Sequence, residues 1–219
     1  MKLRIVLTIL VCTIAGLIAT SCGDDDPVAP PPLKDDDFKD LTQKDDVLFN
    51  LEWLFNEFNQ SQYDKLLDDD FVFFFSDADF SSGRTPKQWT REYEIMAYKG
   101  FYDPNRAEKR VIDRSLVLTY ADDAWTEIAP YDPVKYAGES WYLTTVEYDM
   151  AIMIDVSPEV TYVASNIQME VTIRWDTDKG HYRMIGWKDG VGGLGSSVSG
   201  VDASVQKTTW GAVKVLCGN

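Results

Sequence analysis

Residues 167–189 have the sequence IQMEVTIRWDTDKGHYRMIGWKD, and this stretch decides the fold. Over residues 167–175, apolar and polar side chains alternate, which is the period of a strand with one buried and one solvated face. Residues 176–180 have the composition of a tight turn, and residues 181–189 predict the returning strand. We therefore expect a long β-hairpin that belongs to an antiparallel sheet, with its first strand running from Thr161 to Trp175.

The same period of two continues upstream of the hairpin. Residues 112–120 and 141–154 alternate in a similar way, and we expect each of them to form a strand. In the second segment the apolar positions that share one face are Val146, Tyr148, Met150, Ile152 and Ile154. Between these two strands, residues 121–139 contain Pro130 and Pro133 and predict an irregular insert.

The N-terminal part of the domain follows the helical period instead. Apolar residues recur at helical spacing from Val47 to Phe58, which predicts a helix capped near Thr42. A second short helix is expected to start at Ser61 and to end before a buried, aromatic strand at 71–75.

A third helix is expected from Pro86 to Gly100, because a proline that follows a capping threonine is typical of a helix start. This helix would place Trp89, Tyr93 and Met96 on one face, and we expect that face to pack in the core.

Helices followed by strands predict one α+β domain. We divide the chain into a signal peptide at 1–21, an acidic tether rich in Pro and Asp at 22–40, the domain at 41–189 and a C-terminal segment at 190–219. The C-terminal segment begins with a Gly/Ser-rich linker and ends in a short docking segment. There, Trp210, Val213 and Leu216 are spaced to form one face of a helix.

Two stretches resemble the nuclear transport factor 2-like superfamily, also called ketosteroid isomerase-like or SnoaL-like. One is the pattern LFN…FN…Y…LLDDDFVF within residues 48–73, and the other is the closing hairpin that ends in GWKD at 186–189. The resemblance implies N-terminal helices packed in a curved antiparallel sheet that forms a conical cup. It implies little about function, since the superfamily includes isomerases, dehydratases, ligand binders, transport factors and association domains.

In such a cup, the alternation places aromatic, Met and Ile side chains along the wall of a pocket. The candidate wall residues are Tyr63, Phe73, Phe75, Trp89, Tyr93, Met96, Tyr148, Met150, Met169, Ile173 and Trp187. Two alternatives follow: the pocket admits a small apolar or aromatic ligand, or these bulky side chains fill the cone themselves.

Catalysis of the isomerase type, which the resemblance allows, uses a carboxylate together with tyrosine inside an apolar pocket. The candidates here are Asp189, Tyr63 and Tyr93, while His181 lies beside a hairpin turn. The sequence has no catalytic triad, phosphate loop or metal-binding cluster, so we expect no cofactor and no metal. We favour a non-catalytic domain that binds a small apolar ligand or supports protein association; the alternative is a small lyase or isomerase of the ketosteroid isomerase type.

The first residues resemble the export signal of bacterial lipoproteins. Lys2 and Arg4 precede an uncharged apolar run over 5–21, and Cys22 follows at the expected cleavage site. The resemblance implies lipidation of Cys22 and anchoring in the cell envelope, at the outer membrane or the cell surface. Ordinary secretion is the alternative.

The charge of the chain excludes one class of partner. Removing residues 1–21 leaves 19 basic and 36 acidic residues, a net charge of −17, which argues against nucleic-acid binding. A membrane contact would therefore depend on acyl chains. The resemblance also allows a homodimer through the sheet face that carries Gln168, Glu170, Thr172 and Arg174.

Overall fold

The computed structural model describes residues 37–57, 59–83, 85–101, 103, 110–155, 160–191 and 205–218. The chain divides into two units, Met1–Leu33 and Lys34–Asn219, and all described residues belong to the second. The predicted signal peptide, Cys22 and most of the acidic tether lie outside the described residues. Within those residues, no helix has the length and apolar character needed to span a membrane.

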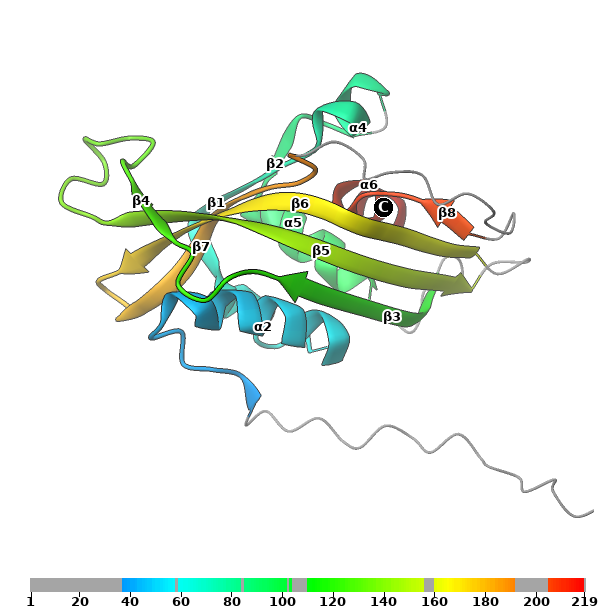
Figure 1. Ribbon diagram of the computed structural model, residues 1–219, viewed down its shortest axis with the longest axis horizontal. Coiled ribbons are helices and arrows are strands. Elements are labelled where there is room, and N and C mark those ends of the chain that lie inside the picture. Colours follow the sequence, from blue (N-terminus) through cyan, green and yellow to red (C-terminus); the bar gives the residue numbers. More distant parts are fainter. Residues whose placement is uncertain are drawn as a thin grey trace, which may run out of the picture. The chain divides into compact units, whose positions relative to one another are not determined.

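The described strands form one curved sheet with the order β2-β1-β7-β6-β5-β3, in which β4 also pairs with β5 and β8 with β6 (Figure 1). The strands are β1 Leu67–Phe74, β2 Gln88–Thr90, β3 Arg110–Thr119, β4 Thr126–Ile128, β5 Trp141–Asp155, β6 Val160–Asp176, β7 His181–Lys188 and β8 Val205–Lys207. The predicted hairpin is present as β6 and β7, which pair antiparallel from Asp176 and His181 onward. Gly180 closes its turn with a positive φ of 70°, a conformation that glycine adopts without strain.

The sheet is mixed, although the alternation along its strands predicts an antiparallel sheet. β1 runs parallel to β7, and β8 runs parallel to β6. Alternation along a strand reports which face is buried and says nothing about the direction of its neighbour. The pairing of the first strand with β7 depends on the path of the whole chain.

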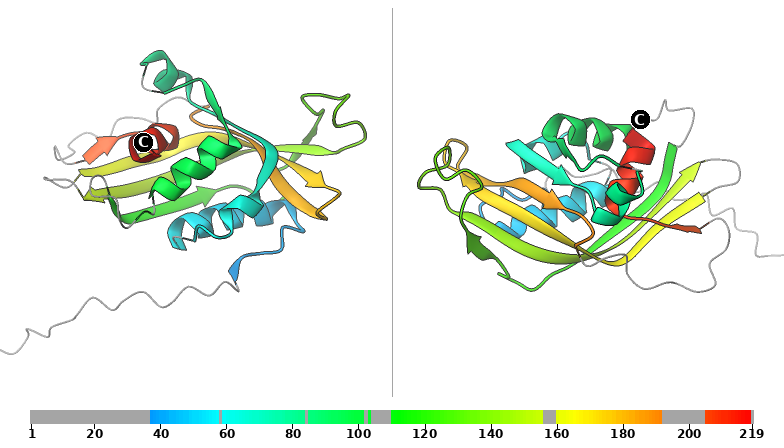
Figure 2. Two further views of the ribbon diagram at one scale, coloured as in Figure 1. Left: turned by 180° about the vertical axis from the view of Figure 1, so that it is seen from behind. Right: turned by 90° about the horizontal axis from the view of Figure 1, so that it is seen from above.

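The helices α2 Lys44–Glu57, α5 Arg91–Phe101 and α6 Trp210–Gly218 lie on one side of the curved sheet (Figure 2). Two shorter helices, α3 Tyr63–Leu66 and α4 Asp77–Ser81, flank β1 in the sequence. Apolar side chains of α2, α5, α6 and the concave face of the sheet belong to one buried cluster. This α+β cup confirms the predicted fold class.

The third predicted helix begins five residues later than expected. Residues 88–90 form β2, which pairs antiparallel with β1 and places Trp89 opposite Phe73. The backbone amide of Phe75 also donates to the carbonyl of Lys87 at 3.1 Å. These bonds to an edge strand outweigh the local helix-start signal of Pro86, because they satisfy several backbone groups at once.

The insert contains β4 and packs on the outer face of the sheet. Tyr136, Trp141 and Ile185 form a second small buried cluster there. The hydroxyl of Tyr131 lies 3.2 Å from that of Thr172, which is only 3% exposed. The face that we expected to be solvated is therefore covered in part by the chain itself, and dimerisation through it stays a prediction.

Candidate functional site

The interior of the cup is occupied by the C-terminal helix α6. Trp210, at the start of this helix, is 1% exposed. Its ring lies 4.6 Å from that of Phe55 and 5.1 Å from that of Trp187, centroid to centroid. Val213 is also fully buried. The chain therefore fills its own cone with a helix that comes after the hairpin.

A buried ion pair joins α6 to α5 inside the cup. Lys214 Nζ lies 2.6 Å from Glu94 Oε1, and both side chains are completely buried. The hydroxyl of Tyr63 donates to Glu94 Oε1 at 2.5 Å, and the indole of Trp89 donates to Glu94 Oε2 at 2.9 Å. Burial lowers the pKa of Lys214 to about 8, and the nearby Glu94 carboxylate only partly opposes this.

A second buried carboxylate, that of Asp189, is hydrogen-bonded to the first turn of α6. Asp189 accepts hydrogen bonds from the hydroxyl of Tyr148 and from the amide of Gly211, both at 2.7 Å. The same hydroxyl accepts from the amide of Trp210 at 3.0 Å. Burial raises the pKa of Asp189, while the bonds from Gly211 and Tyr148 act against this rise. Burial, followed by the charge of Asp189, raises the pKa of Tyr148 well above its ordinary value.

A third carboxylate fixes the residue that precedes α6. Asp79 Oδ2 accepts from the hydroxyl of Thr209 at 2.5 Å and from that of Ser76 at 2.7 Å. Thr209 in turn accepts from the amide of Ala212 at 3.2 Å. The start of α6 is thus held by Asp79 and Asp189, and its middle by Glu94.

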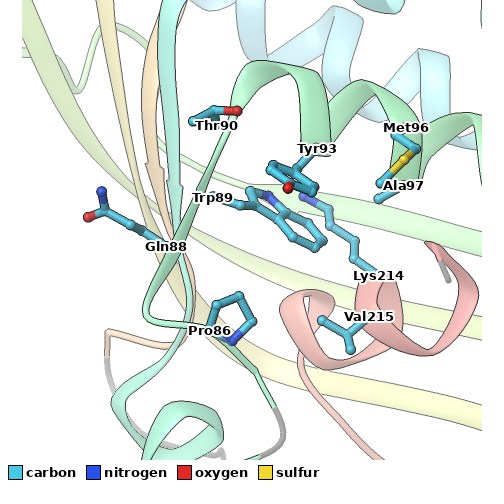
Figure 3. Close-up of a pocket in the computed structure, with 9 residues that line it drawn as sticks. All are labelled: Pro86, Gln88, Trp89, Thr90, Tyr93, Met96, Ala97, Lys214 and Val215. Atoms are coloured by element: carbon cyan, nitrogen blue, oxygen red, sulfur yellow. The ribbon is translucent and has the colours of Figure 1, made fainter.

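A cavity of about 450 Å³ opens where α6 meets β2 and α5 (Figure 3). Its lining residues are Pro86, Gln88, Trp89, Thr90, Tyr93, Met96, Ala97, Lys214 and Val215. Trp89 is half-buried, whereas Tyr93 is 56% and Met96 50% exposed. Figure 3 shows these three side chains and Val215 around one opening. The lining is mainly apolar, and its polar side chains include those of Gln88, Thr90 and the buried Lys214.

The structure separates the predicted pocket residues into two groups. Those in the buried core are Tyr63, Phe73, Phe75, Tyr148, Met150, Met169, Ile173 and Trp187. The remaining three, Trp89, Tyr93 and Met96, line the cavity at the mouth of the cone. Tyr93 and Met96 are therefore not part of the core, contrary to the expectation for this helix face.

The predicted catalytic residues are not brought together as one group. Asp189 accepts from Tyr148, which was predicted only as a wall residue, while Tyr63 donates to Glu94. Tyr93 lies at the surface. Asp189 and Tyr148 do not line the cavity in Figure 3. Among the described residues, no cluster of His, Cys, Asp and Glu has the arrangement of a metal site.

Sequence reasoning missed Glu94 and Lys214. Glu94 shares the buried face of α5 with Ala97, Tyr98 and Phe101, at helical spacing. Lys214 is the one charged residue in the segment WGAVKVL at 210–216. Each of these two apolar stripes contains a single charged residue, and the two charges have opposite signs. Charged side chains are stable in a core only when they are paired, so this pattern could have predicted the contact between Glu94 and Lys214.

No protein-family model and no curated protein sequence matches the chain. Among solved structures, the chain is similar to a conserved protein from Planctomyces limnophilus, with 14% identity and a TM-score of 0.42 over 65% of this chain and 88% of that one. It is also similar to an NTF2-like protein of unknown function in nutrient uptake from Rhodospirillum rubrum, with 14% identity and a TM-score of 0.42 over 66% and 94%. An NTF2-like protein from Cytophaga hutchinsonii matches with 14% identity and a TM-score of 0.37 over 66% and 91%. At these identities and TM-scores the similarities say nothing about function.

Proposed function

We propose that this chain is an exported, lipid-anchored protein whose domain binds a small apolar or aromatic molecule in the cavity between β2, α5 and α6. The observation that carries the proposal is the group of Trp89, Tyr93 and Met96 around a cavity of about 450 Å³. This volume falls within the range of small-molecule sites, which are mostly apolar with a few polar groups.

The exposure of these side chains supports a binding role. An aromatic and a thioether side chain that are each about half exposed leave apolar area in contact with water at the mouth of the cone. Covering such area with a ligand is favourable by about 25 cal/mol per Å². Met adapts its shape to different ligands, and Trp and Tyr offer flat surfaces for stacking.

The geometry favours binding over isomerase-type catalysis. Two acid–tyrosine pairs exist in the cup, Asp189 with Tyr148 and Glu94 with Tyr63. However, both oxygens of each carboxylate already accept hydrogen bonds, and α6 supplies donors to both groups. A catalytic base must reach the proton that it removes from a substrate. In this arrangement the acids hold the chain together instead.

The anchoring part of the proposal is supported by the sequence alone. The basic start, the apolar run and Cys22 have the order of a lipoprotein signal. A mature net charge of −17 makes an electrostatic contact with anionic lipids unfavourable, so that attachment would require acyl chains.

Binding can be tested with the neutral, apolar dye N-phenyl-1-naphthylamine, whose fluorescence rises in apolar sites. We expect wild-type protein to bind it and Met96→Asp to weaken binding at least about tenfold, because a carboxylate would then have to be desolvated in the cavity. Val117→Asp is the matched control, since Val117 is 53% exposed on β3 and does not line the cavity. Equal affinity for the dye in wild type and both variants would show that the dye does not bind in this cavity, which would contradict the proposal. Native mass spectrometry of the purified protein then searches for a bound natural ligand.

A further inference from the structure

The ammonium group of Lys214 is held in the way that proteins hold ammonium ligands. Besides the 2.6 Å contact with Glu94, it lies 3.8 Å from the ring centroid of Phe73 and 4.1 Å from that of Trp187. The ring of Trp210, from α6 itself, is 5.0 Å away. A carboxylate combined with aromatic faces around a cation is the chemistry of an aromatic cage.

The cage is built almost entirely without α6. Phe73 lies on β1, Trp187 on β7 and Glu94 on α5. Glu94 is also oriented by groups outside α6, namely the hydroxyl of Tyr63 and the indole of Trp89. The part of the cup outside α6 therefore presents the oriented Glu94 carboxylate and the ring faces of Phe73 and Trp187. These groups would surround any cation that lies between them.

The part of the cup outside α6 is also rich in buried acid groups. Besides Glu94, it contains Asp189, which is fully buried, and Asp79, which is 6% exposed. Donors from residues 209–214 satisfy all three, and Lys214 is the cation that contacts Glu94. Without the C-terminal helix, this interior would attract a positively charged group strongly.

We propose that the cup around Glu94 is a binding site for an organic ammonium ion, and that Lys214 of the C-terminal helix occupies this site as an internal ligand. The ligand class is a primary or secondary amine on a short apolar or aryl body. A quaternary ammonium fits less well, because Glu94 Oε1 accepts an N–H donor in this site. The site adjoins the apolar cavity at the mouth, because Lys214 also lines that cavity and Trp89, another lining residue, donates to Glu94. The carboxylate sets it apart, since it selects a cation over an uncharged molecule.

The first experiment uses Lys214→Ala in the full chain. This change removes three methylenes and the ammonium, which is the size of n-propylammonium, and leaves the rest of α6 in place. We expect n-propylammonium to bind this variant at least about tenfold more tightly than wild type, where Lys214 competes with it. At ten times its dissociation constant it should raise the Tm of the variant by about 3–6 °C. 1-Propanol is the uncharged probe of similar size and should have no such effect.

The matched control is Glu94→Gln combined with Lys214→Ala, which keeps the space and removes the carboxylate. We expect n-propylammonium to lose at least about tenfold in affinity there. Equal effects of the amine and the alcohol, or equal binding with and without Glu94, would overturn the proposal and leave an apolar hole as the explanation. Because Lys214 also lines the cavity at the mouth, dye binding is no control for these variants. Far-UV circular dichroism and urea unfolding check instead that both variants fold.

The second experiment uses wild-type protein and remains informative if Lys214→Ala does not fold. Phenethylammonium should displace Lys214 and raise amide hydrogen exchange in residues 210–218, whereas phenethyl alcohol should not. Unchanged exchange in residues 210–218 across the whole amine titration contradicts the proposal.

Discussion

Replacing Lys214 with methionine should remove a specific pH dependence of stability. The pKa of this lysine is about 8 in the folded chain and 10.5 in its ordinary state, and burial is the main cause. Between these values the folded chain has released a proton that the unfolded chain still holds. Stability therefore rises as the pH increases through this window, since the unfolded state binds more protons.

The expected magnitude follows from the two pKa values. Between pH 8 and pH 10 the free energy of unfolding of wild type should gain about 2 kcal/mol from this one group. The window ends near pH 10 because tyrosines ionise above it. The raised pKa of Tyr148 then makes stability fall with pH. Around Lys214, Glu94 and Asp189 carry the opposite charge, and both favour its protonated form.

The measurement is urea unfolding followed by tryptophan fluorescence at pH 8, 9 and 10, in wild type and Lys214→Met. Methionine has a similar length, but Lys214→Met leaves the buried Glu94 without its counter-ion, so this variant also changes the cost of burying Glu94. Glu94→Gln with Lys214→Met removes the whole ion pair, and wild type is therefore compared with this double variant as well. Parallel pH profiles for wild type and both variants would refute a buried lysine with a lowered pKa.

Three further outcomes are expected. Trp210→Ala should lower the free energy of unfolding by about 3–5 kcal/mol in urea titrations, because it empties the centre of the cup. Gly211→Ala should lower it by about 1–3 kcal/mol in the same assay, since an added Cβ would lie 2.7 Å from the ring of Phe75. Cys22→Ser should move the protein from the membrane fraction to the soluble fraction on immunoblots, whereas the Cys12→Ser variant should stay in the membrane fraction. Retention of the Cys22→Ser variant in the membrane fraction would contradict lipidation.

The long strands could be predicted from sequence because their signal is local. Alternation at 141–154 and 167–175 locates β5 and most of β6, and the turn composition locates the start of β7. A strand with one buried face carries this period in its own residues. The parallel pairing of β1 with β7 has no comparable signal, because it depends on contacts between segments far apart in the chain.

The wrong face of α5 was selected for a physical reason. Trp89, Tyr93 and Met96 form an apolar series at helical spacing, yet Tyr93 and Met96 are about half exposed. The buried face of α5 contains Glu94. A search for helix faces made only of apolar residues passes over this face because of the glutamate. The glutamate is stable there only because Lys214, 120 residues later, supplies its counter-ion.

The ion pair between Glu94 and Lys214 also explains why the cone is filled by α6. The resemblance ends at residue 189, so the pocket was predicted for a sheet and helices that lacked their last element. The segment at 210–216 is apolar apart from Lys214, and a helix of this kind is stable only when both its apolar face and its charge are satisfied. An apolar cup that contains the buried Glu94 meets both requirements. A lone charge in an apolar stripe is therefore a sequence signal for a distant partner of opposite charge, and it is strongest where two such stripes occur in one chain.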